Sequence, residues 1–176
     1  MNVNTEGEDP GTPFFMDDNA PLIAGLRAGP VKKRRAAATG LGKSGDPAAI
    51  PLLAAALADP HPSVRCGVVL ALGRLGDSSA VPPLISVLGD PEPVVRAAAI
   101  AALGRIKDPA AVTALIGCLQ DREMEVRTGA AVVLGKLGDT RAIGALKQCE
   151  ADPFSDVREA AADAVIRIER KRRIRR

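Results

Sequence analysis

The chain has 176 residues, of which 47% are hydrophobic and 26% charged, with a formal net charge of +3. It contains no Trp, no Tyr and three Phe, so its core is expected to consist of Leu, Val, Ile and Ala, which favours packed helices over a β-sandwich or barrel. The sequence contains no apolar run long enough for a membrane span, no secretory signal pattern and no disulfide framework; we expect a cytoplasmic protein without a membrane span.

The N-terminal segment, residues 1–18, is acidic and rich in Gly, Pro and Asn. It contains no basic residue, and its acidic residues are Glu6, Glu8, Asp9, Asp17 and Asp18. Charged segments with few apolar residues cannot bury enough surface to fold, so we predict that residues 1–18 are disordered.

From residue 19 onward the sequence repeats with a period of 31 residues. The phrase DPHPSVRCGVVLALGRLGD, which begins at Asp59, returns as DPEPVVRAAAIAALGRIKD at Asp90 and as DREMEVRTGAAVVLGKLGD at Asp121. A fixed period indicates a repeated structural unit rather than a catalytic motif, which is needed only once. A partial unit over about 19–40 is expected to precede full units over about 41–71, 72–102, 103–133 and 134–168.

Each unit predicts two helices joined by a turn. The first helix follows an Asp that can accept hydrogen bonds from free N–H groups at the helix start: Asp46, Asp77, Asp108 and Asp139. Apolar residues then recur at spacings of three and four in both helices, for example Ile50, Leu53 and Leu57, followed by Val64, Val68, Leu72 and Leu75.

Glycines recur at two positions of the repeat, one inside the predicted second helix and one directly after it. Gly45, Gly76 and Gly138 follow the helix, where a left-handed residue is common; Lys107 stands there in the third unit, so we expect its turn to differ slightly. Within the helix, Gly42, Gly73, Gly104 and Gly135 each cost about 1 kcal/mol relative to Ala. Their recurrence indicates that neighbouring backbones approach closely there.

The pattern D…VR..A..ALG.LGD..A…L…L resembles HEAT repeats, and specifically the short HEAT-like type found in phycobilin lyase subunits. The resemblance covers residues 19–170 and leaves a basic C-terminal tail, residues 171–176. It implies an all-α fold, a right-handed α-α superhelix of about five helix pairs. It implies no particular activity, because this repeat serves many purposes.

A row of arginines at the repeat period has two interpretations. It could bind phosphate, or each Arg could bond an Asp of the turns between helices and so orient successive units. The resemblance favours this structural ladder, which consists of Asp59, Arg65, Asp90, Arg96, Asp121, Arg127, Asp152 and Arg158, with Arg34 at the start of the arginine row.

The residues that most often carry chemistry are sparse. The single histidine, His61, lies in a turn between two prolines and has no partners for a metal site. Cys118 and Cys149 occupy equivalent positions and are expected in the core, whereas Cys66 could be an exposed thiol. The sequence contains no phosphate-binding loop or nucleophile elbow. We therefore expect no catalytic residue, no metal and no cofactor.

The positions one, two, five and nine residues after the ladder arginines remain free to vary. In the HEAT-like proteins that this chain resembles, they line the concave side. In the middle units they form a small, apolar strip bordered by basic residues: Cys66, Gly67, Leu70, Arg74, Ala97, Ala98, Ala101, Arg105, Thr128, Gly129, Val132 and Lys136. We predict that the chain is a non-catalytic scaffold or adaptor that binds another protein. The partner is expected to bind through an acidic or amphipathic helix. Homo-oligomers are compatible with the sequence.

Two alternatives remain open. The basic residues Arg170, Lys171, Arg172, Arg173, Arg175 and Arg176 could bind nucleic acid weakly through phosphates, or form a solvated helix end, or contact the acidic N-terminal segment. The resemblance also permits a bilin lyase-like accessory subunit, although no residue marks a bilin site.

Overall fold

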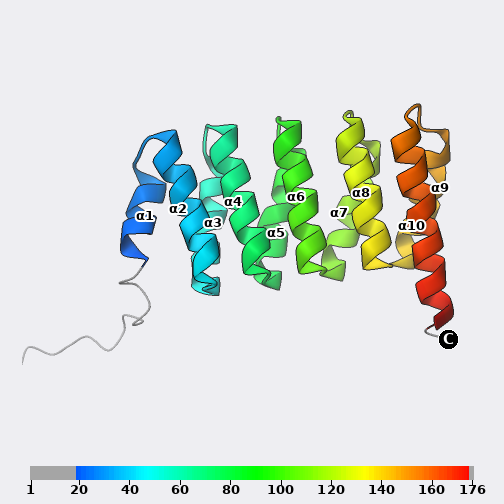
Figure 1. Cartoon of the computed structure of the whole chain (residues 1–176), viewed down its shortest axis with the longest axis horizontal. Helices are drawn as coiled ribbons and strands as arrows, with labels where there is room; N and C mark the ends of the chain where they lie inside the picture. The colour runs from blue at the N-terminus through cyan, green and yellow to red at the C-terminus, as the bar shows by residue number, and fades with distance from the viewer. Residues whose placement is uncertain (1–18, 175–176) are drawn as a thin grey trace, which may run out of the picture.

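The structure, a computed structural model, describes residues 19–174, and over that range it is all helical. Its ten α-helices form five pairs that stand side by side in chain order (Figure 1). The first helices of the pairs are α1 (Ala20–Arg27), α3 (Ile50–Ala55), α5 (Val81–Ser86), α7 (Val112–Gly117) and α9 (Ile143–Gln148). The second helices are α2 (Val31–Ser44), α4 (Pro62–Leu75), α6 (Pro93–Ile106), α8 (Met124–Leu137) and α10 (Ser155–Ile174). The predicted α-α superhelix is confirmed.

The first helices from α3 to α9 are shorter than the sequence pattern suggests, because each is flanked by two 3₁₀ turns. The turns before the helices are Pro47–Ala49, Ser78–Ala80, Pro109–Ala111 and Thr140–Ala142; those after them are Ala56–Ala58, Val87–Gly89, Cys118–Gln120 and Cys149–Ala151. Asp46 Oδ1 accepts a hydrogen bond from the Ala48 N–H at 2.9 Å, and Asp77, Asp108 and Asp139 cap their segments in the same way.

The second helices α2, α4, α6 and α8 each span 14 residues and end at a left-handed residue. Gly45, Gly76 and Gly138 have φ values of 72°, 72° and 76°. The expectation of a different turn after α6 is wrong, since Lys107 adopts the same conformation with φ 60° and donates its N–H to Leu103 O. This conformation is unfavourable for a residue with a side chain by about 1–2 kcal/mol.

Glycines allow the second helices to approach one another closely. A Cβ added to Gly73 would lie 2.7 Å from Ala102 Cβ, and one added to Gly42 would lie 2.6 Å from Ala71 Cα. The second helices also contact one another more extensively than the first helices do. Closer spacing in one layer favours the inner side of a curved stack, so the place of the second helices on the concave face stays a prediction.

The last unit differs from the others at the contact glycine. Ile166 stands where α8 has Gly135, and this residue is 62% exposed. Glu150 is also exposed, whereas the equivalent Leu119 is buried. Lys171 Nζ donates to the backbone carbonyl of Lys136 and ties the extended end of α10 to α8. In this structure these positions of the last unit, in α10 and in the turn after α9, are therefore exposed.

Within residues 19–174, no helix is both long enough and apolar enough to cross a lipid bilayer.

Candidate protein-binding surface

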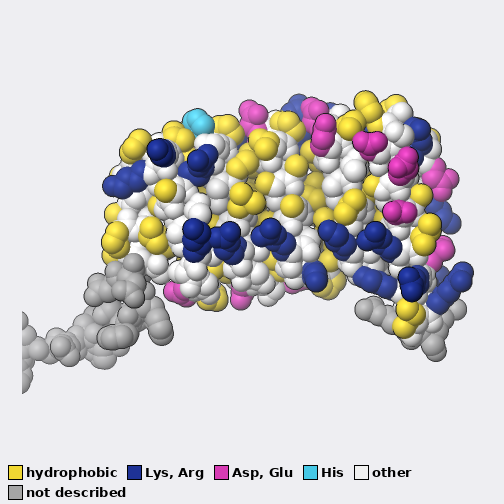
Figure 2. All heavy atoms as spheres, in the orientation of Figure 1, with side chains coloured by type: hydrophobic (Ala, Val, Ile, Leu, Met, Phe, Trp, Pro, Cys, Tyr) yellow, Lys and Arg dark blue, Asp and Glu magenta, His cyan; other side chains and the backbone are white. Residues whose placement is uncertain are grey.

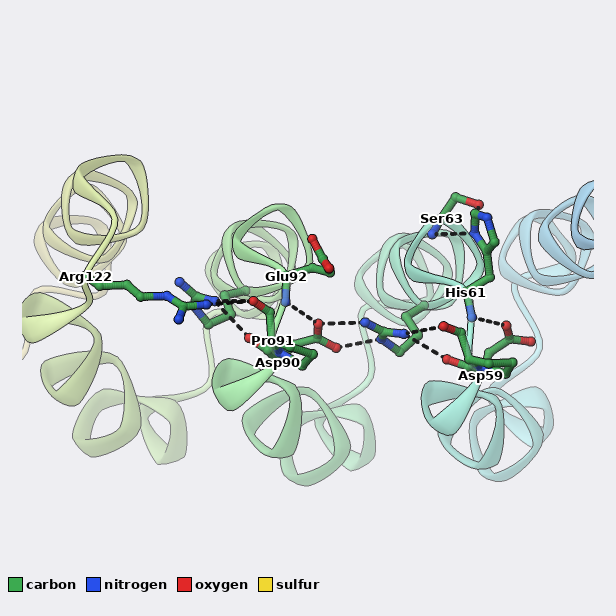
Figure 3. Close-up of polar contacts among 10 residues, drawn as sticks. Asp59, His61, Ser63, Asp90, Pro91, Glu92 and Arg122 are labelled. Atoms are coloured by element: carbon green, nitrogen blue, oxygen red, sulfur yellow. Dashed lines mark hydrogen bonds and ion pairs between the residues drawn. The ribbon is translucent and has the colours of Figure 1, made fainter.

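Arginines that recur at the repeat period join each unit to the next by bonding Asp side chains of the turns. Arg65 donates from Nε to Asp90 Oδ2 at 2.7 Å and from Nη2 to Asp90 Oδ1 at 2.9 Å. Its Nη1 donates to the carbonyls of Asp59 at 2.9 Å and Pro60 at 3.2 Å (Figure 3). One guanidinium thus donates hydrogen bonds both to backbone carbonyls in the turn of its own unit and to the carboxylate of the following unit.

The same bidentate pair recurs along the stack. The pairs are Arg34 with Asp59, Arg65 with Asp90, Arg96 with Asp121, and Arg127 with Asp152. Arg158, in the last unit, bonds only the carbonyls of Asp152 and Pro153 within the described residues. Because the donors of the paired arginines are occupied, and because Arg96 is 4% exposed, the row acts as the structural ladder and leaves little to offer a phosphate.

The ladder carboxylates are held in their ionised form. Burial by itself would raise the pKa of Asp90, but hydrogen bonds from the Arg65 guanidinium and the Glu92 N–H outweigh it and lower the pKa. Asp59 has a lowered pKa for the same reason, with the hydrogen bond from Arg34 as the largest contribution. Such charge-assisted bidentate bonds are among the stronger ones in proteins.

The histidine and the cysteines have structural surroundings. His61 Nδ1 accepts a hydrogen bond from the Ser63 N–H at 3.3 Å and caps α4 (Figure 3). Burial raises the pKa of the Cys118 thiol to about 11, and Cys149 is buried as well. Cys66 is half-buried, not exposed, and burial raises its pKa also. Across residues 19–174, His, Cys, Asp and Glu form no group that could hold a metal ion.

The predicted binding positions all lie on the second helices α4, α6 and α8, but they differ in exposure. Six are exposed, namely Leu70, Arg74, Ala101, Arg105, Val132 and Lys136. Five are half-buried: Cys66, Ala97, Ala98, Thr128 and Gly129. Gly67 is buried because the side chain of Arg35 packs over it, with Cγ 2.9 Å from where a Cβ would stand. Gly67 therefore does not line the open surface.

Large apolar side chains lie exposed on this face. Leu70 is 54% exposed, Val132 38% and Val94 60%. The sequence interpretation missed Val94, although it precedes Ala101 by seven residues and so lies on the same side of α6. Applying helical spacing in both directions from the predicted positions would have found it.

A straight row of basic side chains crosses the same face. We call it the basic row, and it consists of Lys43, Arg74, Arg105, Lys136 and Arg167. All five are exposed, and none forms an ion pair with another residue of the range 19–174. Figure 2 shows Lys and Arg side chains running across the second-helix face with apolar side chains above them. Arg167 was missed as a member, although it follows Arg158 by the same nine residues.

The basic tail does not begin as a separate segment. Arg170, Lys171, Arg172 and Arg173 belong to α10, which continues to Ile174. Lys171 is occupied by its hydrogen bond to α8. Arg175 and Arg176, like the predicted disordered segment 1–18, lie outside the described residues.

Two shallow hollows lie beside the ladder. One of about 450 Å³ is lined by Ile23, Arg34 and Leu52, and another of about 390 Å³ by Arg127, Gln148 and Cys149. Arg34 and Arg127 stand three repeat periods apart, so the two hollows are the same feature of the unit junction. Neither brings together a set of catalytic groups.

Comparison with known proteins identifies the repeat. A family model described as HEAT repeats matches residues 19–91 and 81–166. A chain in the complex of CpcE and CpcF of phycocyanin lyase from Nostoc sp. PCC7120 is 29% identical, with a TM-score of 0.74; the match covers 97% of this chain and 71% of that one. No curated protein matches the sequence.

Two further solved structures share the fold at lower identity. An engineered protein is 21% identical with a TM-score of 0.64, and the match covers 87% of this chain and 80% of that one. A designed armadillo repeat protein in complex with the peptide (KR)4 is 17% identical with a TM-score of 0.66, and the match covers 85% and 81% of the two chains.

Proposed function

Since the chain belongs to the HEAT-repeat family, we propose that it is a non-catalytic scaffold that binds another protein on its concave, second-helix face. The observation that carries the proposal is the exposure of Leu70, Val94 and Val132 on the face that also holds the basic row. Exposed apolar side chains gathered on one face of a stable solenoid mark an interaction surface. The three free cysteines support a cytoplasmic location, where thiols stay reduced.

Similar solved structures support a binding role. The designed armadillo protein is in complex with a basic peptide, and the Nostoc chain is in complex with another protein chain. In the present chain the concave face carries basic residues, so its partner is expected to be acidic.

The decisive experiment compares partner capture by three forms of the full chain. The wild type is compared with a Leu70→Asp, Val132→Asp double variant, which places two carboxylates on the concave face. The matched control is Ser86→Asp with Thr113→Asp, which adds the same charge to exposed positions of the first helices. We expect the first variant to lose at least tenfold in affinity for the captured partner and the control to keep it. Equal affinity of all three folded proteins would refute the proposal.

A bilin lyase-like accessory role is a second candidate, supported by the 29% identity to the phycocyanin lyase complex chain. The purified protein incubated with bilin would then show a bound pigment by absorbance after gel filtration. The absence of any retained pigment would exclude bilin binding by this chain alone.

Nucleic-acid binding is a third candidate, supported by the basic end of α10. A chain that ends at Ile168 would then lose its salt-dependent affinity for single-stranded nucleic acid. If it binds as strongly as the full chain, the tail has no such role.

A further inference from the structure

The basic row and the apolar strip beside it specify the shape of the partner. Resting on the proposed function, we infer that the partner segment is an amphipathic α-helix with a carboxylate at every seventh residue. It lies across α4, α6 and α8, nearly parallel to the stacking direction. Arg74, Arg105 and Lys136 face its carboxylates, and the apolar strip faces its hydrophobic stripe.

The spacing of the row sets the spacing of the acidic residues. Packed helices stand about 8–10 Å apart, so successive members of the basic row are separated by about that distance. Seven residues of an α-helix rise about 10.5 Å and complete nearly two whole turns. Asp or Glu at positions i, i+7 and i+14 therefore places three carboxylates on one side, each opposite one basic residue.

The chemistry of the strip favours a helix over an extended peptide. An extended chain leaves its backbone N–H and C=O groups free, and burying them without partners is costly. In α4, α6 and α8 the strip positions carry no carboxamide, and the Thr128 hydroxyl already donates to Met124 O at 2.8 Å. A helix satisfies its own backbone groups and needs only apolar contact and opposite charge.

The exposed apolar residues indicate where the hydrophobic stripe of the partner packs. Leu70 and Val132 project from α4 and α8, while the small Ala101 lies exposed on α6 between them. Large side chains of the partner fit over Ala101, where Leu70 and Val132 flank them. The centre of the strip thus carries a small side chain between two larger ones.

Charges at the two ends of the face set the direction of the bound helix. On α10, Glu159 and Asp163 are exposed together with Arg167. In contrast, α2 exposes Arg35 and Lys43 and contains no acidic residue. The N-terminus of a helix is partially positive and its C-terminus partially negative. The partner helix therefore runs with its N-terminus toward α10 and its C-terminus toward α2.

The probe is a pair of synthetic peptides of identical composition that form helices of 18 residues. One carries Glu at spacings of seven with Leu on the adjoining side, and the other carries the same Glu residues at spacings of five. Binding to the full chain is measured by fluorescence anisotropy at low and moderate salt. We expect the seven-spaced peptide to bind about tenfold more tightly, since three exposed ion pairs form only in register.

Two variants of the full chain locate the effect. Arg105→Gln is expected to weaken the seven-spaced peptide about threefold, and Lys147→Gln, at an exposed position of α9, to leave its affinity unchanged. Equal affinity for the two peptides, or an effect of Lys147→Gln as large as that of Arg105→Gln, would overturn the inference. If neither peptide binds while capture still depends on Leu70 and Val132, the helix register is wrong and the scaffold proposal stands.

Discussion

Lys107 is the residue at which the repeat departs from its own rule. Gly45, Gly76 and Gly138 reach positive φ without a side chain, whereas Lys107 adopts the same left-handed conformation with one. Its N–H donates to Leu103 O, as the N–H groups of Gly76 and Gly138 donate to the Leu carbonyls at the equivalent positions. The geometry of the helix end thus sets the backbone conformation at this position, even though the conformation is unfavourable for a residue with a Cβ. Stability is therefore lost at this one turn.

Lys107→Gly is expected to raise the free energy of unfolding by about 0.5–1 kcal/mol, because relief of the left-handed strain exceeds the added flexibility of glycine. Urea denaturation of the full chain would measure the change. Lys107→Ala is the matched control and should give no such gain, since alanine keeps the Cβ. A gain with alanine as large as that with glycine would show that the turn is not strained.

The ladder arginines are expected to contribute unequally to the free energy of unfolding. Arg96 and Asp121 have side chains 5% and 11% exposed, so removal of the guanidinium leaves a carboxylate with little water around it. Arg158 has no carboxylate ahead of it within the described residues.

Arg96→Ala should therefore lower the free energy of unfolding by about 3 kcal/mol, and Arg158→Ala by less than about 1 kcal/mol. Chemical denaturation of both variants, side by side, checks the difference. Similar losses in the two would mean that the bonds to backbone carbonyls, which both arginines make, carry the stabilisation instead of the ion pair.

At the scale of the helix, the glycines inside the second helices set the distance between units. Gly73 lies against Ala102, whereas Gly117, at the end of α7, has no atom within 4 Å of the place where a Cβ would stand. The same substitution thus has opposite consequences at the two sites.

Gly73→Ala is expected to destabilise the protein by about 1–3 kcal/mol, because the new methyl group would sit 2.7 Å from Ala102 Cβ and force α4 and α6 apart. Gly117→Ala should stabilise it by about 0.5–1 kcal/mol through helix propensity. Thermal unfolding of the two variants tests the pair of signs. A stabilising Gly73→Ala would mean that the second helices separate without loss.

The sequence was sufficient to predict the paired helices, because the apolar spacing of Val64, Val68 and Leu72 recurs in α6, α8 and α10, and these three residues are buried. The 3₁₀ turns around α3 to α9 could not be predicted, since they depend on how a short segment is compressed between an Asp cap and the next turn. The exposure of single positions could not be predicted either. Gly67 lies two residues after Arg65, a spacing that predicts an exposed position, but the side chain of Arg35 from the neighbouring unit covers it. The repeat pattern predicts which residues of one unit share a helix face, but it does not predict which side chains of the neighbouring unit cover them.

At the scale of the whole molecule, acid should weaken every junction together. Asp59, Asp90, Asp121 and Asp152 each have a pKa lowered from the ordinary 3.8. Their ion pairs therefore contribute their full stability above pH 3.8, and that contribution is lost as the pH falls through the lower pKa values of the folded state.

The free energy of unfolding should be nearly constant from pH 7 to pH 5 and fall steeply below pH 4. Asp90→Asn should be less stable than the wild type at pH 7. The gap should narrow below pH 4, because the wild-type carboxyl group takes up a proton first in the unfolded chain and, at lower pH, in the folded chain. Urea titrations across this range measure both curves. A gap that stays constant down to pH 2 would contradict a role for the Asp90 charge.

The ladder also gives the rod a direction. Each unit extends a guanidinium forward and presents a carboxylate backward, so one unit can follow another in a single orientation only. In a duplicate of residues 72–102 inserted after Ala102, the Asp would face the Arg of the unit before it and the Arg would face the Asp of the unit after it, with the contact glycine in place. The length of such a protein can therefore change during evolution in whole steps of 31 residues, without a new kind of joint, while the α1 and α10 ends stay as they are.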